Sequence, residues 1–281
     1  MKSSDAFKVN RKLRQLKGCV GYENVKSTNY LMSLARFKWV YKYMDLETAI
    51  RCLTSGTLRF AEPTQWSDKY ESRFYNADYS NVCKSRDCTP RLYACCFTHK
   101  KASEAAWKTY SYNKAGLGCR CVQFKINLKR LRLGLDSFAT ANGFQVCESL
   151  MCYDLTDKRI ESLHEKKSSL YGEFFKGFSL ESYLSLLSLK RQAFDYEEEI
   201  RYFLIPKNLD SEVNAETFVK IEWKKIVEEI LVDSKMSYVE KEILTLYCEK
   251  AGLNISQNGG NGIKIRPVKL YEAPTGQVKI E

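Results

Sequence analysis

Hydrophobic and polar positions first fall into a clear pattern near residue 36 of the chain. The stretch "RFKWVYKYM", residues 36–44, is aromatic and β-branched, and it predicts a strand. Asp45 is a typical N-cap for the following "LETAIRCLTSG", where apolar residues recur at helical spacing and Gly56 is a typical stop. "TLRFAE" then predicts a second strand that ends before Pro63. The chain therefore opens with a strand, a short helix and a strand.

The later pattern favours strands over helices. Further strands are expected over residues 91–99, 116–126, 150–155, 197–205, 226–233 and 262–272, and helices over 103–113, within 157–192 and over 237–254. Because strands outnumber helices and do not alternate regularly with them, the sequence predicts an α+β fold with a single mixed sheet and helical insertions. Residues 66–91 predict a long loop with short helical pieces. The polar, basic residues 1–30 predict an N-terminal arm or helix, and residues 31–281 the single domain.

Composition fits an ordinary globular chain. The sequence has 281 residues, of which 44% are hydrophobic and 28% charged, enough for one large domain. It contains no apolar run of roughly 18 residues and no apolar signal segment at its N-terminus, so we expect no membrane partner and a cytoplasmic location. Without a secretory signal, the eleven cysteines, including Cys83 and Cys88, predict reduced thiols. None of their spacings is that of a zinc site and only two histidines are present, so no metal is favoured.

The charge balance favours an anionic partner. The formal net charge is +11, and basic residues concentrate in "RKLRQLK", residues 11–17, and "KINLKRLRLG", residues 125–134. Either cluster is compatible with a nucleic acid as partner, and either is also compatible with an ordinary solvated face. The oligomeric state stays open.

The stretch "FDYEEEIRYFL", residues 194–204, places three glutamates directly before an apolar strand. Side chains alternate faces along a strand, so Glu197, Glu199 and Arg201 are expected on one face and Glu198 on the other, in solvent. On the shared face, Arg201 can keep a carboxylate ionised or bind a phosphate. One face of this strand is therefore a candidate site. The alternative is a Glu199–Arg201 pair that only orders the strand.

Four separated segments together resemble a bacterial family, the Domain of Unknown Function 2971 family. They are "YKY", residues 41–43, "LTSGTLRFAEPTQWSDKYE", residues 53–71, "AWKTYSYNKAGLGC", residues 106–119, and "FDYEEEIRYFL". The resemblance spans roughly residues 37 to 235. The sequence departs from the family pattern at two positions, with Lys69 where the family has proline and Lys114 where a histidine is expected.

A weaker resemblance implies a chemistry. A strand, a short helix, a second strand and a late strand introduced by a glutamate-x-glutamate pair are similar to the split sheet of ADP-ribosyltransferases. That likeness implies NAD as substrate and either ADP-ribose transfer or NAD cleavage, as in a bacterial toxin or phage-defence effector. It also implies site residues: Glu199 and Glu197 as catalytic groups, and Tyr41, Tyr43, Arg59 and Trp66 as NAD-binding groups. Tyr110 and Arg201 are added as NAD-binding groups because of their positions in this sequence.

Two alternatives belong to other classes of protein. One is a nucleic-acid-binding or nuclease module, in which Asp68, Glu71, Glu197 and Glu199 hold a divalent cation. The other is a noncatalytic module whose basic surface binds an acidic partner. Sensitivity to a metal chelator distinguishes the first from a transferase, and an inert Glu199→Gln substitution is expected only of the second.

Overall fold

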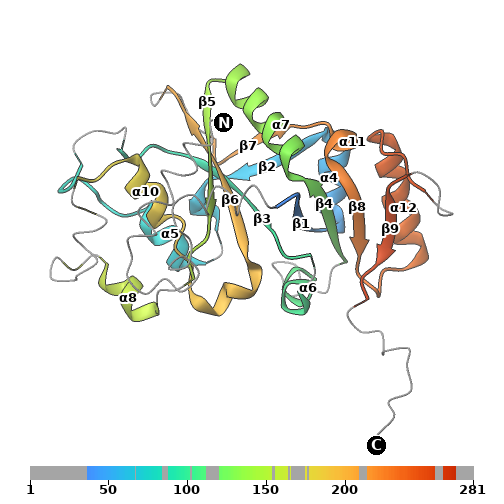
Figure 1. The fold of residues 1–281 in the computed structure, drawn as a ribbon, viewed down its shortest axis with the longest axis horizontal. Helices are drawn as coiled ribbons and strands as arrows, with labels where there is room; N and C mark the ends of the chain where they lie inside the picture. The colour runs from blue at the N-terminus through green and yellow to red at the C-terminus, as the bar shows by residue number, and fades with distance from the viewer. Residues whose placement is uncertain are drawn as a thin grey trace, which may run out of the picture.

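The sheet of this protein is mixed and carries helices on both faces (Figure 1). The computed structural model describes residues 37–66, 68–83, 88–101, 103–111, 120–153, 156–163, 165, 175, 177–208, 214–256 and 262–269. The predicted arm at residues 1–30 and Lys114 lie outside these ranges. The α+β fold with a single mixed sheet is confirmed. Among the described residues, no helix is long and apolar enough to cross a membrane.

The strands and helices keep the labels of Figure 1. The strands are β1 (Trp39–Asp45), β2 (Thr57–Ala61), β3 (Tyr93–Thr98), β4 (Cys121–Asn127), β5 (Phe144–Leu150), β6 (Glu199–Pro206), β7 (Glu216–Lys220), β8 (Val227–Val232) and β9 (Lys264–Pro267). The helices are α4 (Leu46–Ser55), α5 (Lys69–Tyr75), α6 (Glu104–Tyr110), α7 (Leu128–Ala141), α8 (Asp157–Ser162), α10 (Leu180–Leu186), α11 (Trp223–Ile226) and α12 (Tyr238–Lys250), with 3₁₀ turns η1 (Pro63–Gln65) and η3 (Gln192–Glu197).

The sheet forks at β3. Its main path runs β5-β6-β3-β1-β4-β8-β9, and β2 and β7 branch from β3. On one side of β3, β1 pairs with the end of β3, where Tyr41 lies opposite Thr98. On the same side, β2 pairs with the start of β3, where Ala61 lies opposite Ala94. All strand pairs are antiparallel except β8 with β9. The middle of β3 therefore faces a gap between the two branches.

The opening strand, helix and strand follow the local signals of the sequence. The carboxylate of Asp45 accepts a hydrogen bond from the backbone N–H of Thr48 at 2.7 Å and caps α4. Gly56 ends the helix with a φ of 64°, a backbone conformation that side chains rarely adopt. These two residues fix the bounds that were predicted for this helix.

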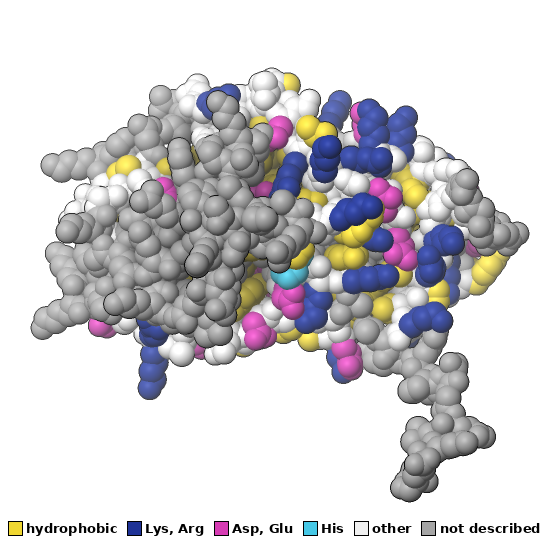
Figure 2. All heavy atoms as spheres, in the orientation of Figure 1, with side chains coloured by type: hydrophobic (Ala, Val, Ile, Leu, Met, Phe, Trp, Pro, Cys, Tyr) yellow, Lys and Arg dark blue, Asp and Glu magenta, His cyan; other side chains and the backbone are white. Residues whose placement is uncertain are grey.

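Two layers of helices cover the two faces of the sheet. The main core lies on the face covered by α4, α7, α11 and α12, where the Trp223 indole N–H donates to the carbonyl oxygen of Cys52 at 2.9 Å. The opposite face carries α5, α8 and α10 over a second apolar cluster, and α6 over a third. In Figure 1, α6 lies in front of the sheet and α4 behind it. Figure 2 shows the front face, where basic side chains gather over the part that carries β4, β8 and β9.

Several sequence predictions are wrong in detail. The strand expected over residues 150–155 overlaps β5 only at Leu150, and residues 128–134 of the basic stretch lie in α7, a helix that was not predicted. Among the described residues of 157–192, helix is interrupted at Leu163 and again at 177–179, with α8 before the first interruption and α10 after the second, and β7 was missed. Cys83 and Cys88, which are five positions apart in the sequence, form a disulfide. The expectation of reduced thiols is therefore wrong for this pair.

Candidate functional site

The glutamate run does not begin as a strand. Glu197 ends the 3₁₀ turn η3, Glu198 has a positive φ of 41°, and β6 starts at Glu199. The turn at Glu198 still leaves Glu197 and Glu199 on one side, as predicted. Glu198 points away, but it is not only in solvent: its carboxylate lies 3.2 Å from the His99 imidazole and 3.1 Å from the Lys100 ammonium.

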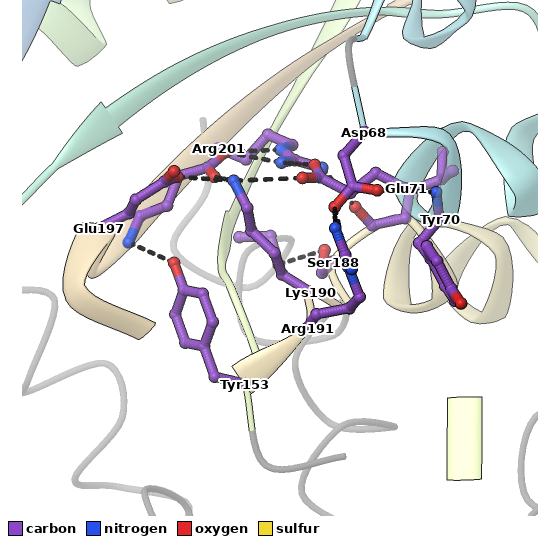
Figure 3. Close-up of polar contacts among 12 residues, drawn as sticks. Asp68, Tyr70, Glu71, Tyr153, Ser188, Lys190, Arg191, Glu197 and Arg201 are labelled. Carbon is purple, nitrogen blue, oxygen red and sulfur yellow. Dashed lines mark hydrogen bonds and ion pairs between the residues drawn. The ribbon is translucent and has the colours of Figure 1, made fainter. Parts of the chain in front are cut away.

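Lys190 lies at the centre of the carboxylates on the site face (Figure 3). Its ammonium is 2.6 Å from the Glu197 carboxylate, 2.9 Å from that of Glu199 and 3.2 Å from that of Glu71 on α5. The lysine follows α10 and is only 7% exposed. A single cation thus joins three carboxylates from three separate elements.

Arg201 forms the second half of this network. Its guanidinium donates to the Glu199 carboxylate at 2.8 Å, to that of Glu71 at 2.6 Å and to the carbonyl oxygen of Leu187 at 2.8 Å. The Trp66 ring lies over it, with the guanidinium carbon 4.1 Å from the ring centroid. Arg201 is 1% exposed, so it positions the carboxylates and does not present free donors to a phosphate.

The network drives the pKa values of the two candidate catalytic carboxyls apart. Burial alone raises the pKa of Glu199, but Arg201 and Lys190 outweigh it and hold that pKa well below its usual range. For Glu197, burial is the larger effect, and the neighbouring Glu199 adds to it, so the pKa is raised despite Lys190. Glu199 is therefore a fixed negative charge, and Glu197 is the carboxyl that exchanges a proton more readily.

A pocket opens beside these carboxylates at the fork of the sheet. Its volume is about 50 Å³, and its lining includes Tyr41, Tyr43, Tyr110, Glu197 and Glu199. The rings of Tyr43 and Tyr110 are stacked, with centroids 5.3 Å apart and an interplanar angle of 5°. Small-molecule sites usually measure several hundred Å³, so a nucleotide enters this pocket only when side chains that line it shift.

The gap in the sheet is closed from the other face by Lys42. Its ammonium donates to the carbonyl oxygen of Cys96 at 2.7 Å, in the middle of β3, and its side chain also lines the pocket. Burial opposes the charge of Lys42, but the neighbouring cysteines outweigh it and raise its pKa. The pocket therefore contains a cation as well as the two carboxylates.

The structure brings most of the predicted residues together. Glu197, Glu199, Tyr41, Tyr43 and Tyr110 line the pocket. Arg201 and Trp66 lie behind the carboxylates.

Arg59 is placed elsewhere. It lies on β2 and pairs with the Glu216 carboxylate of β7, because β2 runs along the other branch of the sheet. The prediction that Arg59 joins the other residues is wrong in this structure.

Sequence reasoning missed four residues of the site. Lys190, Lys42 and Cys96 contact or line it, and the Tyr153 hydroxyl accepts a hydrogen bond from the backbone N–H of Glu199 at 2.9 Å. One signal was available for Lys190: buried carboxylates need cations, and it is a lysine seven residues before Glu197. Lys42 lies inside the "YKY" segment that carries the family resemblance, and nothing local in the sequence marks Cys96 or Tyr153.

The carboxylates proposed for a divalent cation are already paired with basic side chains. Asp68 pairs with Arg191 at 3.1 Å, and the ammonium of Lys190 occupies the space between Glu71, Glu197 and Glu199. Within the described ranges, no group of three or more His, Cys, Asp or Glu side chains is arranged to hold a metal ion. The arrangement is that of an internal ion network.

Comparison with known proteins gives one structural likeness. No family model matches the sequence, so the resemblance to the Domain of Unknown Function 2971 family stays a prediction, and no curated protein matches it. Among solved structures, the chain is similar to DarT of Thermus sp. 2.9 in complex with NAD+, with a TM-score of 0.36 and 10% identity over 82% of this chain and 96% of that one. A TM-score this low assigns no role to any residue.

Proposed function

We propose that the protein is an ADP-ribosyltransferase or NAD glycohydrolase that cleaves the bond between nicotinamide and ribose. The observation that carries this proposal is the pocket in which the ionised Glu199 lies next to the aromatic rings of Tyr41, Tyr43 and Tyr110. Flat rings suit a planar nicotinamide, and a fixed carboxylate suits a sugar that becomes positively charged.

The proposed reaction uses the charge of Glu199. The C1′–N bond of NAD breaks, its electron pair goes to the nicotinamide ring, and the positive charge moves from that ring to the ribose. Glu199 is 4% exposed and held by Arg201 and Lys190, so its negative charge is in place before the reaction begins. At a separation of about 4 Å and an effective dielectric constant of 20, two unit charges attract by about 4 kcal/mol.

Glu197 is the proposed proton acceptor. The acceptor hydroxyl or amine, or water in hydrolysis, forms a bond to C1′ and loses a proton to the Glu197 carboxylate. Its raised pKa makes Glu197 the stronger base of the two carboxylates in the pocket. The division of roles between Glu197 and Glu199 therefore follows from their opposite pKa shifts.

A toxin or phage-defence effector acting in the cytoplasm is the biological role that we propose. In this role, cleavage of NAD or modification of a macromolecule would arrest growth. Induced expression of the wild-type protein is expected to stop growth, whereas the Glu199→Gln variant is not.

The test is nicotinamide release from NAD by the purified protein. Glu199→Gln keeps the shape of the side chain and removes its charge, so we expect about a 100- to 1000-fold loss of turnover. Glu198→Gln is the matched control, because Glu198 is the adjacent glutamate and pairs with His99 and Lys100 outside the pocket. Its turnover is expected to stay within about twofold of wild type.

A second variant keeps the test decisive if Glu199→Gln fails to fold. Tyr110→Ala removes a stacked ring from the pocket, and roughly a tenfold lower kcat/KM is expected from the loss of one aromatic contact. No nicotinamide release by a folded wild-type protein, with or without a cell lysate as a source of acceptor, contradicts the proposal. Equal turnover of wild type, Glu199→Gln and Tyr110→Ala contradicts it as well.

A further inference from the structure

A row of charged side chains crosses the open part of the sheet from the pocket to its edge. Tyr41 lies opposite Lys125 of β4, Lys125 opposite Glu229 of β8, and Glu229 opposite Lys264 of β9. Residues paired across neighbouring strands share a face, so these side chains stand on the same face as the pocket. Strands lie about 4.8 Å apart, so the row extends about 15 Å from Tyr41, which lines the pocket.

Positive charge predominates along this row. The Glu229 carboxylate lies 3.4 Å from Arg266, 3.7 Å from Lys101 and 3.8 Å from Lys125. One carboxylate at these distances leaves most of the positive charge uncompensated. Lys101 and Arg266 are more than half exposed, with 57% and 54% of their side chains accessible. Figure 2 shows basic side chains gathered over the part of the sheet that carries β4, β8 and β9.

An aromatic ring lies among the basic side chains. The ammonium of Lys125 is 4.5 Å from the centroid of the Trp39 ring, and that of Lys38 is 4.7 Å from it. Trp39 is partly exposed and lies on β1 two residues before Tyr41. We call the surface formed by Trp39 with Lys38, Lys101, Lys125, Lys264 and Arg266 the basic face.

We propose that the basic face binds a single-stranded nucleic acid and leads it to the pocket as the acceptor of ADP-ribose. Lysine and arginine side chains neutralise phosphates, and an aromatic ring on a flat sheet stacks an unpaired base. An acidic peptide has the negative charge but no base that stacks on Trp39. In a duplex, the bases are paired and stacked on one another and do not reach the Trp39 ring. The combination of a basic row with a partly exposed ring therefore favours a single strand.

The acceptor part of this inference rests on the proposed function, but the binding part does not. Binding is measured without NAD, by fluorescence anisotropy of a labelled oligonucleotide of about 16 nucleotides, as DNA and as RNA. Nicotinamide release without any nucleic acid tests the pocket separately. Failure of one assay with success of the other shows which proposal is wrong.

Charge reversal on the two most accessible lysines of the basic face tests the electrostatic part. The double variant Lys38→Glu, Lys101→Glu is compared with Lys129→Glu, Lys224→Glu, which makes the same charge change at exposed positions of α7 and α11 on the other face. The first double variant is expected to bind at least roughly tenfold more weakly and to lower the slope of log K against log salt by about 1.4, since each phosphate contact contributes about 0.7. The second is expected to bind like wild type.

Substitution of Trp39 tests the stacking part. Trp39→Ala is expected to weaken binding of the single strand by about 5- to 150-fold, the range for one stacked base, while Trp39→Phe keeps most of the affinity. Tighter binding of either the DNA or the RNA strand identifies the sugar and supports the proposal. Equal losses in both double variants, equal binding of a duplex, or equal binding of a polyglutamate peptide overturns it.

Discussion

Lys190→Met is the most informative perturbation of the ion network. Methionine keeps the length and most of the volume of the lysine stem, so the substitution mainly removes a charge. In the wild-type protein, that charge lies within 3.2 Å of three carboxylates, all of them at most partly exposed. Without it, Arg201 is the one cation among the described residues that still contacts Glu71 and Glu199.

The expected loss of stability is large. At about 3 Å and an effective dielectric constant of 20, each ammonium–carboxylate pair attracts by about 5 kcal/mol, and desolvation of the charges offsets most of this. Removing one partner of a buried ion pair costs about 3–5 kcal/mol in comparable cases. For a chain of this size, the melting temperature should fall by roughly 6–20 °C. The Lys225→Met control removes a lysine that is 63% exposed and paired with Glu222, and its free energy of unfolding should change by less than about 1 kcal/mol.

The pH dependence distinguishes a lost charge from lost packing. The pKa of Glu197 is already above its ordinary value, and loss of Lys190 raises it further. A carboxyl whose pKa is raised by folding is stabilised by protonation, so the stability deficit of Lys190→Met should shrink as the pH falls from about 7 toward about 5. The measurement is chemical unfolding at several pH values. A deficit below about 1 kcal/mol, or one that does not change with pH, refutes this account of the network.

Three further predictions concern Glu197 and two buried polar side chains outside the network. Nicotinamide release should fall as the pH drops through the raised pKa of Glu197, because only the ionised carboxylate accepts a proton; a profile unchanged in Glu197→Gln refutes its role as base. Arg132→Ala should destabilise the protein by about 3–5 kcal/mol in thermal unfolding, and a loss below about 1 kcal/mol contradicts this. The reason is that the Glu148 carboxylate, which is 1% exposed, then keeps only the Tyr202 hydroxyl as a partner among the described residues. Gln123→Leu should raise the free energy of unfolding by about 1 kcal/mol, because both polar atoms of the Gln123 side chain are buried without a hydrogen-bond partner among the described residues; a marked loss of stability shows that they have one.

Local signals account for the parts of the fold that the sequence predicted. Asp45 and Gly56 bound α4 in the sequence and in the structure, because each acts within its own turn. The helix α7 was not predicted, although Leu128, Leu131 and Leu135 recur at helical spacing and are all buried.

Other features depend on contacts between distant residues. The pairing of β7 with β2 leaves no local mark in the sequence, whereas Gly177, with a φ of 65°, and the N-cap Ser179 mark the start of α10. In the site, alternation along a strand correctly grouped Glu197, Glu199 and Arg201, although Glu198 leaves the strand geometry. The contact of Arg201 with Glu71 joins residues 130 positions apart, and no pattern near either of them predicts it.

The fork of the sheet explains why these features meet in one place. β1 and β2 each pair with β3 at a single position, so the strand between Ala94 and Thr98 lacks a neighbour on that side. A sheet without such a gap leaves no room for a pocket between its strands, because adjacent backbones fill the space. Here the ammonium of Lys42 donates a hydrogen bond to the carbonyl oxygen of Cys96, and the pocket opens beside this contact. β1 then contributes Tyr41 and Tyr43 to the pocket and Trp39 to the basic face, so a single strand connects the basic face with the pocket that Glu199 lines.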